Sequence, residues 1–79
     1  MILSANGWDL AIINEEVGYD KHRSYLEVIW SKLNTDGLII MDYVSRHKPA
    51  KEAFLDFCKY VNREPVVVNT RYGIGIIRK

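Results

Sequence analysis

The stretch Asp36-Gly37-Leu38-Ile39-Ile40-Met41-Asp42 carries the clearest pattern in the chain. Four apolar residues follow one another with no polar residue between them, and the turn formers Gly37 and Asp42 lie on either side of them. An uninterrupted apolar run of this length is typical of a strand covered on both faces, as in a parallel sheet. Because Leu10-Ala11-Ile12-Ile13 has the same character, we predict two parallel strands, over residues 10–13 and 38–41.

Two more strands are predicted nearer the C-terminus. Val66-Val67-Val68 and Ile74-Gly75-Ile76-Ile77 are rich in β-branched residues and are bounded by turn formers. Residues 69–73 are too few to form the crossover that a parallel pair requires. We therefore expect the last strand to run antiparallel to the strand at 66–68.

Two amphipathic helices are predicted between these strands. Apolar residues recur there at spacings of three and four, which is the period of a helix with one buried face. We expect helices over 20–33 and 49–62, with Asp20 as an N-cap and Pro49 in a first turn. The residues that define the two buried faces are His22, Tyr25, Leu26, Ile29, Trp30 and Leu33, then Ala50, Ala53, Phe54, Phe57, Cys58 and Val61.

These elements predict a single α/β domain over residues 1–79, with a four-stranded mixed sheet whose last strand is antiparallel. Parallel crossovers are right-handed, so two crossovers in the same direction place both helices on one face of the sheet. Successive side chains of a strand point to opposite faces, so the helix-free face also receives apolar side chains. The candidate interface residues on that face are Leu10, Ile12, Leu38 and Ile40.

An uncovered apolar face of several hundred Å² is more than a monomer normally exposes. Residues 1–6 are too few to cover it, even if they fold back over part of it. We therefore expect a protein partner. The simplest partner is a second copy of the chain, which makes a homodimer either by face-to-face packing or by edge-to-edge pairing of the first strands.

Composition excludes several other classes of protein. The chain has 79 residues, with 11 Lys and Arg against 10 Asp and Glu, which argues against a dedicated nucleic-acid binder. Cys58 is the only cysteine, so an intrachain disulfide is excluded, and a reducing cytoplasm is the expected location. Neither a bilayer-spanning apolar run nor a leader pattern is present, so no membrane association is expected.

The order of the motifs resembles the C-terminal half of class I S-adenosylmethionine-dependent methyltransferases, of the metal-dependent O-methyltransferase type. This resemblance covers nearly the whole chain and implies half of a three-layer, Rossmann-like fold. The matching stretches are Trp8-Asp9-Leu10-Ala11-Ile12-Ile13, Asn14-Glu15-Glu16-Val17-Gly18-Tyr19, Ile29-Trp30-Ser31-Lys32-Leu33-Asn34-Thr35-Asp36-Gly37, Met41-Asp42-Tyr43 and Tyr72-Gly73-Ile74-Gly75-Ile76-Ile77-Arg78-Lys79.

The resemblance also implies which functional residues to expect. In such enzymes the Gly-rich cofactor loop and the ribose-binding acid lie in the N-terminal half, so no cofactor-binding or catalytic residue is assigned here. Val17 stands where related enzymes often carry a histidine base. Asn14, Glu16 and Asp42 keep oxygen ligands that suit Mg²⁺, with a solvated acidic loop as the alternative.

Two functions follow as expectations. The first is a non-catalytic, methyltransferase-like module that acts through protein–protein interaction, as a homodimer or by binding another partner. The alternative is a subunit of an S-adenosylmethionine-dependent methyltransferase whose cofactor-binding half is supplied by another chain. S-adenosylmethionine and Mg²⁺ are expected only under that alternative.

Overall fold

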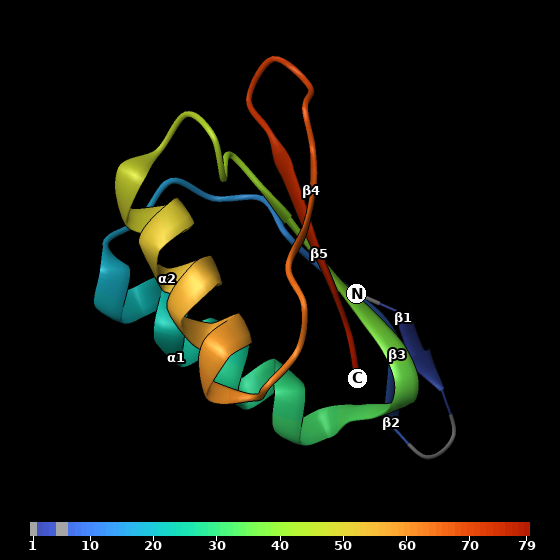
Figure 1. Ribbon diagram of the computed structural model, residues 1–79. Helices are drawn as coiled ribbons and strands as arrows, with labels where there is room; N and C mark the ends of the chain where they lie inside the picture. Colours follow the sequence, from blue (N-terminus) through green and yellow to red (C-terminus); the bar gives the residue numbers. More distant parts are fainter. Residues whose placement is uncertain (1, 5–6) are drawn as a thin grey trace.

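A mixed β-sheet carries two α-helices on one face, as the computed structural model of the chain shows (Figure 1). The structure describes residues 2–4 and 7–79. None of the helices in this part of the chain is long and apolar enough to cross a membrane. The elements are β1 (Ile2–Ser4), β2 (Gly7–Ile13), α1 (Tyr19–Lys32), β3 (Leu33–Asp42), α2 (Lys48–Tyr60), β4 (Val66–Val68) and β5 (Ile74–Arg78).

The sheet has the strand order β1-β2-β3-β5-β4 among the described residues. β2 and β3 are parallel, with Ala11 opposite Ile39, which confirms the parallel pair predicted from the two apolar runs. β4 and β5 form the expected antiparallel hairpin, with Val67 opposite Gly75. β5 also pairs antiparallel with β3, so the last strand lies between β3 and β4.

The hydrophobic core lies between the sheet and the two helices. One set of alternate sheet residues, including Ala11, Ile39 and Ile77, is fully buried there. The helices contribute the faces that the periodicity predicted, since eight of the twelve residues named for those faces are buried within the helices. The buried helical residues are His22, Leu26, Ile29, Ala50, Ala53, Phe54, Phe57 and Cys58.

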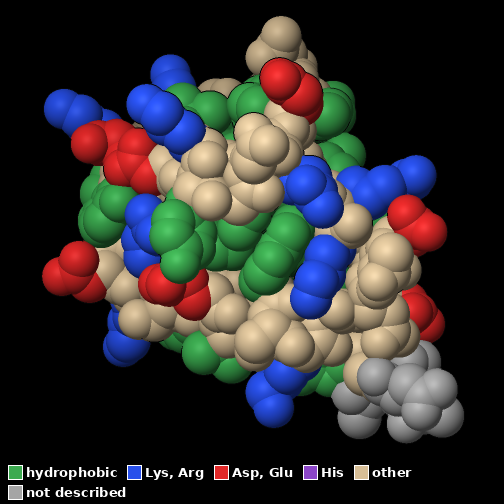
Figure 2. All heavy atoms as spheres, turned by 60° about the horizontal axis from the view of Figure 1, so that its bottom comes forward, with side chains coloured by type: hydrophobic (Ala, Val, Ile, Leu, Met, Phe, Trp, Pro, Cys, Tyr) green, Lys and Arg blue, Asp and Glu red, His purple; other side chains and the backbone are tan. Residues whose placement is uncertain are grey.

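A cluster of aromatic and basic side chains closes the lower end of this core. Seen from the bottom of Figure 1, apolar side chains reach the surface and Lys and Arg side chains border them (Figure 2). The Trp30 ring packs edge-on against Phe57, with 5.5 Å between ring centroids. The ammonium of Lys79 lies 5.5 Å from the centre of the Trp30 ring, so the end of β5 is attached to the end of α1.

The prediction of a four-stranded sheet was incomplete, because β1 adds a fifth strand at the edge. β1 pairs antiparallel with the first half of β2, with Leu3 opposite Trp8 and Ser4 opposite Gly7. A strand of only three residues leaves no periodicity to detect in the sequence. The idea that residues 1–6 fold back over the open face falls partly outside the described residues, because 1, 5 and 6 are not described, whereas 2–4 lie in β1.

The predicted N-cap of the first helix was wrong. Gly18 occupies the N-cap position, and no side chain caps the helix there. Asp20 lies instead within the first turn, where a carboxylate interacts favourably with the positive end of the helix dipole. Leu33 begins β3 rather than ending α1, whereas Pro49 does lie in the first turn of α2 as expected.

Candidate interaction surface

The face of the sheet that points away from the helices is apolar across four neighbouring strands. The pairing registers align Ile12 with Ile40, Ile40 with Ile76, and Ile76 with Val66. These four side chains form a row that crosses β2, β3, β5 and β4 in turn. We call the helix-free side of these four strands the open face. Its apolar residues are Leu10, Ile12, Leu38, Ile40, Ile74, Ile76, Val66 and Val68.

The open face is incompletely covered in the described part of the chain. Ile12 is 52% exposed, Val66 51% and Val68 45%, while the other five apolar residues are half-buried by their neighbours. On the opposite side of the same strands, Ala11 and Ile39 are fully buried. Leu10, Ile12, Leu38 and Ile40 therefore lie on the helix-free face as expected, and their role as an interface stays a prediction.

Half of this face was not predicted from the sequence. Val66, Val68, Ile74 and Ile76 share it, and they were assigned only as strand residues. A signal was present in the last strand, where Gly75 interrupts the apolar run and separates Ile74 from Ile76. The glycine marks the side of β5 that packs closely on a helix, so its two neighbours must point the other way.

An apolar groove extends the open face around the outer edge of β2. The groove lies between β2 and α1 and has a volume of about 490 Å³. Ile12 belongs to both the groove and the open face, and Val28 in the groove is 53% exposed. On the edge of β2 opposite β3, β1 pairs only with residues up to Leu10, so the described chain places no strand on that outer edge beside residues 11–13. The groove is lined by Trp8, Ile12, Ile13, Asn14, Glu15, Ser24, Tyr25, Val28 and Ile29.

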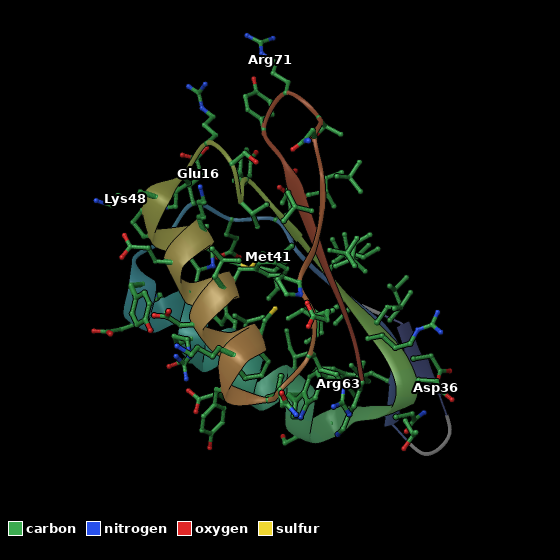
Figure 3. The ribbon with its side chains drawn as sticks, viewed as in Figure 1. Glu16, Asp36, Met41, Lys48, Arg63 and Arg71 are labelled. Carbon is green, nitrogen blue, oxygen red and sulfur yellow. The ribbon has the colours of Figure 1, made fainter. Side chains whose placement is uncertain are left out.

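The predicted Mg²⁺ ligands lie at the carboxyl ends of β2 and β3. Glu16 has its Oε2 atom 3.9 Å from Nδ1 of His47, and Figure 3 shows it near the start of α2. Asp42 accepts a hydrogen bond from the backbone N–H of Tyr43 at 2.8 Å. Among the described residues no three His, Cys, Asp or Glu side chains form a group that could hold a metal ion. Mg²⁺ binding by Asn14, Glu16 and Asp42 therefore stays a prediction.

Two histidines lie together near the same end of the molecule. His22 is fully buried, and within the described residues neither of its ring nitrogens has a hydrogen-bond partner. His47 donates from Nε2 to the carbonyl oxygen of Val17 at 2.8 Å. Burial lowers the pKa of His22, the nearby His47 lowers it further, and Glu15 opposes both effects. His22 is therefore held in its neutral form.

Basic and aromatic side chains gather at the tip of the β4–β5 hairpin. The guanidinium carbons of Arg46 and Arg71 lie 5.2 and 5.3 Å from the centre of the Tyr72 ring, and Arg71 points away from the fold (Figure 3). The backbone N–H of Ser45 donates to the carbonyl oxygen of Tyr72 at 3.0 Å. These contacts attach the hairpin tip to the β3–α2 connection, which is a structural role.

Comparison of the sequence with models of known protein families and with curated proteins found no match.

Proposed function

We propose that this chain is a methyltransferase-like half domain that has no cofactor site of its own and acts by binding protein. The observation that carries the proposal is the open face, where Ile12, Ile40, Ile76 and Val66 form a continuous apolar row across four strands. Such a face is typical of a sheet that packs against another layer. The proposed role of the chain is to supply this sheet to a partner.

Energetics support a partner on the open face. Removing about 400 Å² of apolar surface from water, at ~25 cal/mol per Å², is worth on the order of 10 kcal/mol. The whole stability of a small domain is about 5–15 kcal/mol. Covering the open face therefore changes the stability of the chain by an amount comparable with the stability itself.

The glycines before and within the last strand, Gly73 and Gly75, do not form a cofactor loop. A Cβ atom on Gly75 would lie 2.7 Å from the Phe54 ring, so this glycine admits the close packing of α2 on β5. Gly73 adopts a φ of 79° against Ser45, in a turn that favours glycine. Both glycines therefore have packing and turn roles, and neither precedes a helix as a phosphate- or cofactor-binding loop would.

Calorimetric titration with S-adenosylmethionine tests the missing cofactor site. We expect no binding heat when the cofactor is added to the chain alone, with light scattering recording the mass of the species present. A monomeric chain that binds S-adenosylmethionine with micromolar affinity would refute the proposal.

The role of the open face is tested with a matched pair of substitutions. Ile40→Lys places a charge in the centre of the face, whereas Leu55→Lys makes the same change at an exposed position of α2. We expect Ile40→Lys to abolish association measured by sedimentation velocity, and Leu55→Lys to leave it unchanged. If the parent chain associates and both variants associate equally well, the open face is not the binding surface.

The alternative function, a subunit of an S-adenosylmethionine-dependent methyltransferase, is favoured by the outer edge of β2, which no strand of the described residues covers beyond Leu10. A strand from another chain fits beside residues 11–13, where the groove leaves room for its side chains. Asn14, Glu16 and Asp42 would then supply oxygen ligands to Mg²⁺ or orient a substrate at the carboxyl ends of β2 and β3.

This alternative predicts a neighbouring reading frame whose product carries a Gly-rich loop after its first strand. Titration of S-adenosylmethionine into a mixture of the two chains should give binding that neither chain gives alone. If no such reading frame exists, or if the mixture fails to bind the cofactor, the alternative is wrong.

A further inference from the structure

Two charged residues lie at opposite ends of the open face. Asp42 is the last residue of β3 and pairs with Ile74, whereas Arg78 is the last residue of β5 and pairs with Leu38. Both alternate with apolar residues of the open face, so both belong to that face. Asp42 and Leu38 are four residues apart in one strand, so the two charges are separated by about 13 Å along the strands, at ~3.3 Å per residue.

Neither charge is neutralised within the described chain. Asp42 accepts one hydrogen bond from its neighbour Tyr43, and no Lys, Arg or His of the described residues forms an ion pair with it. Arg78 is exposed, and no described carboxylate lies within ion-pair distance of it. The apolar row through Ile40 and Ile76 lies between the two charges.

This pattern distinguishes the two symmetric ways of stacking two copies of the face. If the two-fold axis runs along the strands, Asp42 of each copy meets Asp42 of the other, and the two Arg78 side chains also meet. If the axis crosses the strands, the strand directions oppose each other, and Asp42 of one copy lies at the same end as Arg78 of the other. The second arrangement pairs opposite charges twice and stacks the apolar rows.

We propose that the partner of the open face is a second copy of this chain, packed face to face with opposed strands, so that Asp42 and Arg78 pair between the copies. This inference rests on the proposed function and names its partner. The charges of the face are complementary under this two-fold axis, as a two-fold interface requires. The formal net charge of +1 leaves little repulsion between two copies.

Charge exchange tests the pairing directly. Asp42→Arg and Arg78→Asp each place like charges at both ends of the interface, whereas the double variant restores opposite charges in the reverse order. We expect each single exchange to raise the dimer dissociation constant at least tenfold, and the double variant to recover most of that loss. Sedimentation equilibrium measures the constant, and far-UV circular dichroism checks that each variant is folded.

A milder variant and the salt dependence of the dimer distinguish a loss of charge pairing from a folding defect. Asp42→Asn keeps an oxygen that accepts the N–H of Tyr43 while it removes the charge, and we expect it to weaken the dimer as well. High salt should weaken the parent dimer and strengthen the two single-exchange variants, because it screens attraction and repulsion alike.

Each adverse outcome points to a different failure. A parent chain that stays monomeric at millimolar concentration overturns the second copy as partner, while the proposed function is judged separately by its cofactor titration. A dimer that is unaffected by either single exchange overturns the opposed-strand packing. A dimer that also survives Ile40→Lys uses another surface, which overturns both this inference and the proposed binding face.

Discussion

The ring of His22 lies 6.0 Å from the ring of His47, measured between centroids, and the two rings meet edge to face. His22 is fully buried and has no hydrogen-bond partner in the described part of the chain. Its pKa is lowered from 6.5, chiefly by burial and then by His47. The unfolded chain therefore binds a proton at His22 more readily than the folded chain does.

This difference predicts a loss of stability in mild acid. Neutral His22 makes its full contribution to the free energy of unfolding above pH about 6.5. That contribution declines as the pH falls below this value, by up to ~1.4 kcal/mol per pH unit. Urea unfolding between pH 7.5 and 5.5 measures the slope. His22→Leu should remove most of the slope, and it should stabilise the chain at pH 7.5 by about 1–2 kcal/mol, because no unpaired polar group is then buried.

His47→Gln is the matched control for this prediction. The side chain of His47 is 24% exposed, so the substitution leaves the buried imidazole of His22 in place. We expect the variant to keep most of the pH dependence of the parent, because burial is the larger cause of the lowered pKa of His22 and only the smaller contribution of His47 is lost. A parent chain whose stability is the same at pH 5.5 and 7.5 would contradict the assignment of a neutral, buried His22.

Local patterns in the sequence were sufficient for the main architecture. The uninterrupted run at 38–41 predicted a strand of a parallel pair, and its pairing with β2 confirms this. The helical spacing that placed Phe54 and Phe57 on one face correctly predicted two core residues. Both inferences depend on side-chain direction within one element, which periodicity records.

Features that depend on tertiary contacts could not be predicted in this way. The position of β5 between β3 and β4 is set by pairing between distant segments, and no local pattern specifies it. The contact of His22 with His47 joins the beginnings of two different helices. The groove beside β2 was not predicted either. Its residue Val28 lies next to the apolar face of α1 but is exposed, so the sequence pattern indicates only an isolated surface residue.

Gly75 is predicted to be intolerant of any side chain. A Cβ atom there would lie 2.7 Å from both Cε1 and Cζ of Phe54, whose ring is fully buried and cannot move into solvent. We expect Gly75→Ala to reduce the free energy of unfolding by about 1–3 kcal/mol, as overpacking does in other cores. Urea unfolding followed by tryptophan fluorescence measures the change.

Gly18→Ala provides the comparison at an unhindered site. A Cβ atom on Gly18 meets no described atom within 4 Å, and the φ of −70° suits any residue. This substitution should change the free energy of unfolding by less than about 0.5 kcal/mol, since restriction of the unfolded chain offsets the poorer N-cap that Ala makes. If Gly75→Ala were equally harmless, the close approach of Phe54 to β5 would be wrong.

Lys79 is predicted to stabilise the junction between α1 and β5. Its ammonium donates to the carbonyl oxygens of Trp30 at 2.6 Å and of Leu33 at 2.9 Å, at the C-terminal end of α1. Carbonyl groups in a last helical turn lack intrahelical partners, and a cation there also interacts favourably with the negative end of the helix dipole. We expect Lys79→Met to cost about 1–2 kcal/mol of stability and to alter the emission of Trp30.

The control for this prediction is Lys32→Met. Lys32 lies in the same last turn of α1 but is exposed, and its ammonium makes no hydrogen bond or ion pair with the described residues. Its loss should change the free energy of unfolding by less than about 0.5 kcal/mol. Equal effects of the two substitutions would show that the carbonyl contacts of Lys79 contribute nothing to stability.

Cys58 is predicted to be inert towards thiol reagents while the chain is folded. The side chain is 1% exposed, and burial raises the pKa of its thiol to about 11. Because the thiolate is the reactive form, both its low population and its inaccessibility slow the reaction at pH 8. We expect labelling by a disulfide reagent to be at least a hundredfold slower in buffer than in concentrated urea.

Lys51→Cys in a Cys58→Ala background is the control: it places a thiol on the exposed side of α2 and should react rapidly in both conditions. If opening of the core limits access to Cys58, labelling should slow further in His22→Leu, because that substitution stabilises the same core. Rapid labelling of Cys58 in the folded chain would contradict the packing of α2 on the sheet.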